Sequence, residues 1–275
     1  MKLATIRDRD RTMAVRIDGE EAVELDAADV GEVLHRDDWP AWAGAGDGPR
    51  RPVADLDYAP LIVAPDKIVC CGLNYRNHIL EFTRELPSHP TLFAKYRSTL
   101  TGAYDDIELP TVTDDVDWEV ELAVIIGTRG RAIPEADAGS HIAGYAVLND
   151  VSMREYQNRT LQWLQGKCFE ATTPLGPWLV TSDESPGPSR EVVCEVDGEV
   201  KQKANTSDLL FGPEHLVSYI SDIITLEPGD VIATGTPGGV GFARDPKEGL
   251  VDGSVMVTRI EGLGECRNVF KAAGA

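Results

Sequence analysis

Three carboxylates beside two apolar segments are the residues of this chain best suited to do chemistry. Glu119 and Glu121 stand at the start of the apolar run 120–126, and the alternation of a strand places both side chains on one face. A second apolar run, 143–148, ends just before Asn149 and Asp150. Like charges side by side at a core strand repel one another and are costly to bury, so a cation should compensate them. The pattern predicts a divalent metal site, because Mg²⁺ is usually held by a few carboxylates, with the other positions left to water and substrate.

The alternative is that Glu119 and Glu121 form the solvated face of a strand, which is the commoner meaning of two acidic residues at this spacing. The position of Asp150 at the end of a strand favours the metal only modestly. Motifs elsewhere in the chain must therefore decide between the two interpretations.

His78 and Glu81 form a second pair that could do chemistry. They are three residues apart, so on a helical turn they share one face and can hydrogen-bond. A carboxylate that holds one imidazole nitrogen raises the basicity of the other, which produces a general base for water. A surface pair on a helix is the alternative. His89, His141 and His215 match no motif, and we expect them on the surface or in loops.

Several short motifs follow one another in an order and spacing that are specific as a set. They are GLNYRNHILE at 72–81, FAK at 93–95, the Glu119/Glu121 pair, NDVSMR at 149–154 with Gln157, GKCF at 166–169, LEPGDVI at 226–232 and TGTP at 234–237. Together they resemble the fumarylacetoacetate hydrolase family, and the resemblance runs from about residue 67 to residue 270.

The resemblance implies a metal site and a base. In this family the matching two glutamates and aspartate, here Glu119, Glu121 and Asp150, bind Mg²⁺ or Mn²⁺, and the chemistry runs through a metal-bound 2-oxo acid. The positions of His78 and Glu81 match the dyad that activates water in the hydrolases. The resemblance also implies a homodimer and a β-rich α+β fold, a mixed β-sandwich roll with a small N-terminal extension.

Other positions are expected to contact the substrate. Lys167 lies near the carboxylates and could neutralise a developing enolate or bind a substrate oxygen. By resemblance, Gln157 orients the substrate, and the Gly235–Thr236 turn grips its carboxylate through a hydroxyl and a backbone N–H. Arg154 has two open interpretations, a carboxylate clamp or the partner in a structural ion pair.

Departures from the family pattern leave the substrate open. Leu73 stands where some acylpyruvate-cleaving members carry arginine, and Tyr96-Arg97 stands where Lys-Pro would be usual. The lysine motif continues Cys168-Phe169-Glu170 rather than with the usual Ser/Gly-Phe-Asp. None of these positions belongs to the expected metal site or to the dyad.

The elements that must position these residues fall into two expected domains. Residues 1–60 are predicted to form a small N-terminal α+β domain, with strands at 2–6 and 13–17, a weak helix at 27–34 and a loop at 42–52. Residues 61–275 are predicted to form the catalytic domain. Its short strands include 61–63 and 68–71, a hairpin at 192–202 with a primed turn, and the strand 231–234. Helical patterns occupy 156–164 and 213–224.

Composition limits the classes of protein to consider. The formal net charge is −20 at pH 7, which argues against nucleic-acid and membrane partners. An anionic substrate is repelled as well, so the site must supply local positive charge from the metal and Lys167. Five cysteines without a C-x-x-C motif argue against a disulfide framework and a structural zinc site. No apolar run could cross a bilayer, and the N-terminus lacks a signal-peptide core, so we expect a cytoplasmic protein.

These features predict Mg²⁺- or Mn²⁺-dependent hydrolysis of a C–C bond in a 2,4-dioxo acid, an acylpyruvate such as fumarylpyruvate from aromatic-ring catabolism. Water deprotonated by His78 and Glu81 would attack the distal carbonyl, and pyruvate would leave as an enolate. The alternative is oxaloacetate decarboxylation, or isomerisation of a hydroxydiene dioate, on the same metal site. A catalytically idle scaffold is a third interpretation, and the presence of all the site residues argues against it.

Overall fold

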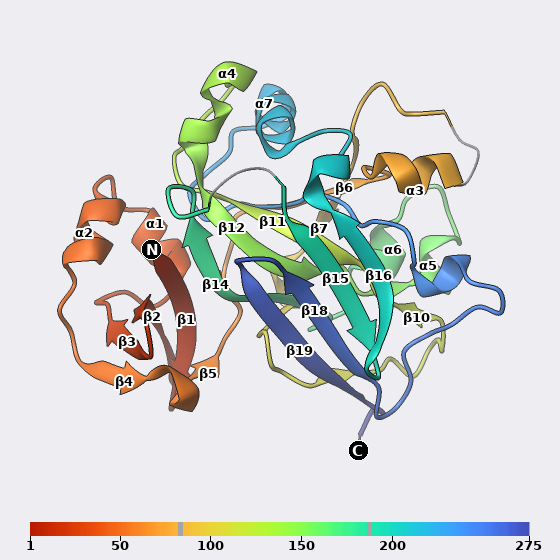
Figure 1. Ribbon diagram of the computed structural model, residues 1–275, viewed down its shortest axis with the longest axis horizontal. Coiled ribbons are helices and arrows are strands. Elements are labelled where there is room, and N and C mark those ends of the chain that lie inside the picture. The colour runs from red at the N-terminus through yellow and green to blue at the C-terminus, as the bar shows by residue number, and fades with distance from the viewer. Residues whose placement is uncertain (82–84, 186–188, 275) are drawn as a thin grey trace.

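The computed structural model describes residues 1–81, 85–185 and 189–274, except for the side chains of His78 and Glu81. Most strands of this described part belong to two sheets that lie one over the other (Figure 1). The helices of the described part are short, and some of them cover the faces of the larger sheet. The fold is therefore a strand-rich α+β fold, as the sequence predicts.

The larger sheet contains, in spatial order, β4 (Arg50–Pro52), β3 (Glu21–Glu24), β2 (Arg11–Asp18), β1 (Lys2–Asp8), β14 (Thr173–Thr181), β12 (Ile142–Asn149), β11 (Val120–Ile126), β17 (Val231–Ala233), β6 (Ile68–Gly72) and β7 (Thr91–Lys95). Two short strands join it from the side, β5 (Asp57–Tyr58) on β1 and β8 (Leu100–Thr101) on β14. Most neighbouring pairs are antiparallel, but β17 and β6 run parallel.

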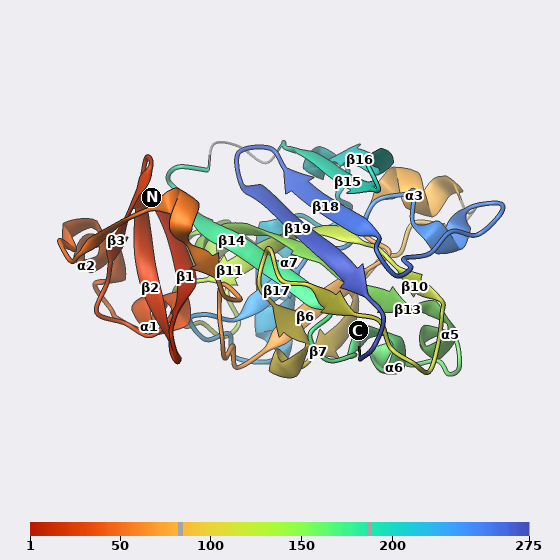
Figure 2. The same ribbon diagram turned by 90° about the horizontal axis from the view of Figure 1, so that it is seen from below.

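The smaller sheet has the order β16 (Glu199–Asn205), β15 (Glu191–Val196), β18 (Val255–Ile260), β19 (Gly264–Lys271) and β9 (Ile107–Glu108). A separate pair joins β10 (Val116–Asp117) to β13 (Ser152–Met153). The view in Figure 2 shows β18 and β19 crossing over the larger sheet near β14. Apolar side chains of both sheets fill the space between them, among them Val147, Val180, Cys194, Met256 and Phe270.

The helices are α1 (Val30–Leu34), α2 (Trp39–Ala45), α3 (Arg76–Glu81), α4 (Glu135–Ala138), α5 (Arg154–Gln157), α6 (Leu164–Lys167) and α7 (Pro213–Ile223). Short 3₁₀ turns occupy η1 (Val53–Asp55), η2 (Arg97–Thr99), η3 (Gly139–His141), η4 (Thr206–Asp208) and η5 (Gly241–Ala243). Within the described ranges, no helix is long and apolar enough to cross a membrane.

The side chains of β11 alternate between the two faces of the larger sheet. Even-numbered residues of Val120–Ile126 pack between the sheets or against the layer that contains α7, whereas Ala123 and Ile125 pack in a separate cluster with α1. Glu119 and Glu121 are odd-numbered, like Ala123 and Ile125, so their side chains point to the same face as those two residues. Both carboxylates therefore belong to the second face, as alternation predicts.

The N-terminal strands continue the larger sheet instead of standing apart from it. Strand β1 pairs with β14, with Lys2 opposite Val180, and Figure 1 shows β1–β4 at the left edge of the sheet. Whether residues 1–60 fold as a domain of their own, apart from 61–275, stays a prediction. The loop expected at 42–52 is wrong in part, because α2 occupies its first residues and β4 its last three. A proline in the first turn favours the start of α2, whereas the glycines that follow favour a loop in the sequence pattern.

Two predicted elements of residues 61–275 are confirmed. The hairpin β15–β16 turns at Asp197 and Gly198 with φ of 54° and 80°, which is the primed turn expected. Helix α7 begins at Pro213 as expected. The helix expected at 156–164 is wrong, because α5 ends at Gln157 and α6 begins only at Leu164. The strand expected at 61–63 is absent from the described chain, which bends there between prolines.

Candidate metal centre and active site

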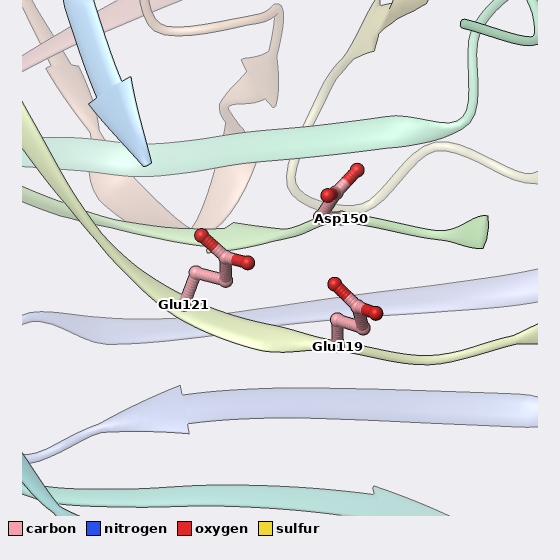
Figure 3. A group of neighbouring side chains, drawn as sticks. All are labelled: Glu119, Glu121 and Asp150. Atoms are coloured by element: carbon pink, nitrogen blue, oxygen red, sulfur yellow. The ribbon is translucent and has the colours of Figure 1, made fainter. Parts of the chain in front are cut away.

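Antiparallel pairing of β11 with β12 brings the three predicted carboxylates together. Val120 lies opposite Asn149, and the backbone N–H of Asp150 donates to the carbonyl of Glu119 at 2.9 Å. Each of Glu119, Glu121 and Asp150 offers an oxygen, and these oxygens all lie within 4.8 Å of one another. Figure 3 shows the two glutamates on one strand, with all three carboxylates reaching into the same space.

Burial makes the charge of this cluster costly. Asp150 is fully buried, and Glu121 and Glu119 are 2% and 7% exposed. Burial raises the pKa of Glu121 well above its usual range, and the charges of Asp150 and Glu119 raise it further. Among the described residues, no cationic side chain pairs with Glu121, whose carboxylate accepts one hydrogen bond, from the backbone N–H of Gly235 at 2.7 Å.

Two buried lysines compensate the other carboxylates. Lys167 Nζ donates to Glu119 Oε2 at 2.7 Å and to Asp150 Oδ2 at 2.9 Å. Burial acts to lower the pKa of Lys167, but Asp150 and Glu119 outweigh it, so the pKa is raised and the ammonium stays charged. Lys95 Nζ donates to Asp150 Oδ1 at 2.5 Å and also to the carbonyl of Lys167. For Asp150, burial opposes ionisation, but the two lysines lower its pKa overall.

Lys95 belongs to the FAK motif, but no role for its side chain could be predicted from the sequence. Its side chain is fully buried at the end of β7, which β17 and β6 separate from β11 in the sheet. A lysine inside an otherwise apolar strand is the available signal, since a buried ammonium requires an anionic partner. The identity of that partner could not be deduced, because Asp150 is 55 residues away in the chain.

Arg154 forms the structural ion pair that was one of its two interpretations, and its role as a carboxylate clamp stays a prediction. Its Nε donates to Asp117 at 2.7 Å, and its Nη1 lies 2.6 Å from Glu119 Oε1 and donates to Gln157 at 2.9 Å. These contacts are structural ion pairs and hydrogen bonds. Its Nη2, however, is buried without a partner in the described chain. A guanidinium held on one side with free N–H groups on the other can receive a carboxylate.

Asp117 is a second residue that sequence reasoning missed. Besides Arg154, it accepts hydrogen bonds from the backbone N–H groups of Gly241 at 2.7 Å and Phe242 at 3.0 Å. It is 1% exposed and therefore acts as an internal anchor for the η5 loop.

The predicted turn at Gly235 and Thr236 lies at the edge of the cluster. Gly235 donates its backbone N–H to Glu121, as described above. Thr236 is partly exposed, and its backbone N–H and hydroxyl hydrogen find no acceptor among the described residues. Pro237 and Gly238, the next two residues, line a pocket of about 420 Å³ together with Tyr75, Asn77, Lys203, Ala204, Asn205, Ser207 and Asp208. The same short segment thus contacts the carboxylate cluster at Gly235 and lines the pocket at Pro237 and Gly238.

His78 and Glu81 occur on α3, the expected helical turn, but their side chains lie outside the described residues. Their pairing stays a prediction. The other histidines match the expectation of peripheral positions. His89 is exposed, His141 contacts the carbonyl of Thr128 at 3.0 Å, and His215 contacts Glu135 at 3.0 Å.

The donor set fits a hard divalent cation. All the candidate ligand atoms are carboxylate oxygens, which Mg²⁺ and Mn²⁺ favour over nitrogen and sulfur. Opposite ligands of Mg²⁺ lie about 4.2 Å apart, so oxygens within 4.8 Å of one another need only small side-chain movements. The buried charges are also unbalanced. Three cations, Lys95, Arg154 and Lys167, face four carboxylates, Asp117, Glu119, Glu121 and Asp150.

Comparison with known proteins adds independent findings. The sequence profile described as fumarylacetoacetate (FAA) hydrolase C-terminal matches residues 67–271. The chain is 44% identical to the oxaloacetate tautomerase FAHD2A, mitochondrial, of Bos taurus over 219 residues, which cover 78% of this chain and 70% of the relative.

Two solved structures are similar along their whole length. A fumarylacetoacetate hydrolase from Exiguobacterium antarcticum is 32% identical with a TM-score of 0.89, and the match covers 99% of both chains. A 5-carboxymethyl-2-hydroxymuconate delta-isomerase from Mycobacterium smegmatis is 33% identical with a TM-score of 0.83, and the match covers both chains completely. The similar proteins thus bear the names of a tautomerase, a hydrolase and an isomerase.

Proposed function

Because this chain belongs to the fumarylacetoacetate hydrolase family, we propose that it is a metal-dependent enzyme that interconverts the enol and keto forms of a small 2-oxo dicarboxylate. Oxaloacetate is the first candidate substrate, since it is named in the relative with 44% identity. The observation that carries the proposal is a set of unpaired hydrogen-bond donors, on Arg154 and Thr236, beside the buried carboxylate cluster.

The chain's own residues have distinct tasks in this reaction. Glu119, Glu121 and Asp150 would hold Mg²⁺ or Mn²⁺, which when bound would supply a Lewis acid for the 2-oxo group. Arg154 Nη2 and Thr236 would hold the neighbouring carboxylate. The ammonium of Lys167, which pairs with Glu119 and Asp150, would stabilise negative charge on the enolate oxygen.

Tautomerisation moves one proton and breaks no carbon–carbon bond. The enol loses its O–H proton, and C3 gains a proton on the way to the ketone. Lys167 keeps its own proton at neutral pH because the adjacent carboxylates raise its pKa. A separate acid–base group is therefore needed, and His78 with Glu81 is our candidate.

A substrate panel tests the proposal. Enol-oxaloacetate, keto-oxaloacetate decarboxylation and an acylpyruvate are each followed with added Mg²⁺ or Mn²⁺ and with a chelator. We expect the fastest metal-dependent rate for the enol–keto conversion. Equal rates with and without the protein for every substrate would contradict the proposal.

The second candidate is hydrolysis of the C–C bond in a 2,4-dioxo acid such as an acylpyruvate. The spacing of His78 and Glu81 favours it, as does the name of the hydrolase whose structure is similar. Decarboxylation of oxaloacetate and isomerisation of a hydroxydiene dioate would use the same metal and the same electron sink. These reactions differ in whether water enters the product.

His78→Ala separates hydrolysis from decarboxylation. Loss of a general base typically costs about 10²- to 10⁴-fold in rate. Acylpyruvate cleavage should fall by this factor, because hydrolysis needs a deprotonated water, while oxaloacetate decarboxylation should persist. Both rates are measured on one preparation, so that a general loss of structure, which slows both, is distinguished from the loss of a base. An unchanged cleavage rate would remove His78 from the mechanism.

We further propose that the protein is a cytoplasmic homodimer, as the sequence and the family resemblance imply. Light scattering tests the oligomeric state directly, and a monomer at micromolar concentration would contradict it. Fractionation of the source cells tests the location.

A further inference from the structure

The side chain of Gln202 links the smaller sheet to both parts of the candidate site. It lies on β16 and is 1% exposed. Its Oε1 accepts from the backbone N–H of Val120 at 2.9 Å, the residue between the two candidate metal-binding glutamates. Its Nε2 donates to the hydroxyl of Thr236 at 2.8 Å and to the carbonyl of Pro237 at 2.9 Å. One amide therefore connects the strand of the candidate metal ligands, β11, to the turn expected to hold the substrate.

The orientation of this amide is fixed by chemistry. A backbone N–H can only donate, so the atom facing Val120 must be the amide oxygen. A backbone carbonyl can only accept, so the atom facing Pro237 must be the amide nitrogen. The two backbone partners agree, and the flipped amide would lose both hydrogen bonds. The group that meets the Thr236 hydroxyl is thus a donor.

A donor at this position determines what the Thr236 hydroxyl can do. A threonine hydroxyl has one hydrogen and two acceptor lone pairs. Gln202 Nε2 occupies a lone pair, so the hydroxyl hydrogen must point elsewhere. None of the described residues accepts that hydrogen, and Thr236 is partly exposed and directly precedes Pro237, which lines the pocket. The hydroxyl is therefore left as a donor for an anion that enters the site.

We propose that Gln202 is a positioning residue that sets the Thr236 hydroxyl as a hydrogen-bond donor for the substrate carboxylate. The proposal rests on the proposed function, in which Thr236 holds that carboxylate. The ligand class is a 2-oxo acid or another small molecule with a carboxylate next to an oxygen atom. Gln202 itself touches no substrate in this account and acts through Thr236.

Oxalate, which imitates the 2-oxo carboxylate, is the probe for a test that needs no turnover. Its Kd is measured by calorimetry on the Mn²⁺-loaded full-length protein and on four variants, Gln202→Glu, Gln202→Met, Thr236→Val and the double variant Gln202→Glu/Thr236→Val. Glu keeps the acceptor for Val120 but turns the neighbouring donor into an acceptor, so the Thr236 hydroxyl would donate to it. Met removes all three hydrogen bonds but leaves the hydroxyl free to donate.

We expect Gln202→Glu and Thr236→Val each to weaken oxalate binding by about 10- to 100-fold, the effect of one hydrogen bond to a charged group. Gln202→Met should weaken it less than Gln202→Glu. In the double variant, the Glu substitution should add little to the effect of Thr236→Val, because the hydroxyl through which it acts is gone. For the enzyme reaction, the loss should appear mainly in KM.

Two controls separate this account from simpler ones. Lys201→Gln, at the next position of β16, changes the net charge by the same −1 and should leave oxalate binding nearly unchanged. The Mn²⁺ affinity of Gln202→Glu should also be that of the wild type, because the Val120 hydrogen bond is retained.

A larger loss in Gln202→Met than in Gln202→Glu would indicate a purely structural role and overturn the proposal. An undiminished effect of Glu in the Thr236→Val background would indicate charge repulsion and overturn it equally. Failure of wild-type protein to bind oxalate, or wild-type affinity in Thr236→Val, would also overturn it. The proposed function fails separately, if no substrate of the panel is converted in a metal-dependent way.

Discussion

The N-terminal strands and the candidate metal centre, the cluster of Glu119, Glu121 and Asp150, both carry many charges, but these charges are compensated differently in the two regions. Near the N-terminus, Arg7 pairs with Asp57 at 2.9 Å and Asp105 at 2.6 Å, and Arg51 pairs with Glu24 at 2.5 Å. These side chains keep partial contact with solvent. In the metal centre the carboxylates and lysines are almost completely buried, and Glu121 lacks a cationic partner in the described chain.

The difference indicates which of the two regions is expected to bind a ligand. Solvent-exposed ion pairs add about 0–1 kcal/mol each and cost little to lose. A buried carboxylate without a cation destabilises the fold unless something binds to it. Strained or uncompensated groups of this kind cluster at functional sites, so the unpaired Glu121 marks the place where a ligand is expected.

Glu121→Gln should have the largest effect, because it removes the buried carboxylate that distinguishes the candidate metal centre from the N-terminal strands. The variant should lose metal-dependent activity by about 10³-fold or more, because several kcal/mol of transition-state stabilisation depend on the cation. In chelator, the same variant should be more stable than wild type, because a buried, repelled carboxylate becomes neutral. Calorimetric Tm values with chelator and with Mn²⁺ measure both effects. The matched control is Glu24→Gln in the N-terminal strands, which should retain activity. A Tm for Glu121→Gln below that of wild type in chelator would argue against an uncompensated charge.

Lys167→Met should have the next largest effect. Removal of this ammonium leaves Glu119 and Asp150 short of positive charge, and breaking a buried pair typically costs about 3–5 kcal/mol. Urea denaturation in chelator measures the change in the free energy of unfolding. Saturating Mn²⁺ should restore part of the lost stability, since the metal replaces the missing charge. A loss below 1 kcal/mol would mean that the pair resembles the surface ion pairs of the N-terminal strands.

Arg7→Gln should show the smallest effect, about 1 kcal/mol at neutral pH. Burial acts to raise the pKa of Asp105, but hydrogen bonds from Arg7 and from the Gly102 backbone lower it overall from the usual 3.8. Stability that depends on a lowered carboxyl pKa is present above the unfolded-state pKa and is lost as the pH falls through the folded-state pKa. The difference between wild type and variant should therefore shrink below about pH 4. Free energies of unfolding at pH 6 and pH 3.5 check this, and a difference that grows in acid would contradict it.

The sequence predicts the part of the site that depends on local pattern. Strand alternation predicts that Glu119 and Glu121 point to the same face. Asp150 comes directly after the strand that pairs with theirs. Lys95, Asp117 and Gln202 could not be assigned in the same way. Their partners lie directly after β12, in η5 and in the Thr236 turn, and only the tertiary fold brings these segments next to the three side chains. Whether the three carboxylates bind a metal stays a prediction.

The same limit explains the errors in secondary structure. The segment 156–164 has a helical composition, but α5 ends at Gln157, which accepts a hydrogen bond from Arg154, and Arg154 in turn pairs with Glu119 and Asp117. Local preference is overridden there by contacts with residues that are distant in the chain. The sequence pattern does not predict α2, because its glycines favour a loop, although alanine and tryptophan form the helix.

Mn²⁺ binding tests the central claim most directly. Calorimetric titration of the chelator-treated protein is carried out on wild type, on Glu121→Gln and on the control Glu24→Gln. We predict one site per chain for wild type and for the control, and an affinity at least about tenfold weaker for Glu121→Gln, at a cost of about 1.4 kcal/mol or more. Equal affinity and stoichiometry in all three proteins would contradict the assignment of Glu119, Glu121 and Asp150 as the metal centre.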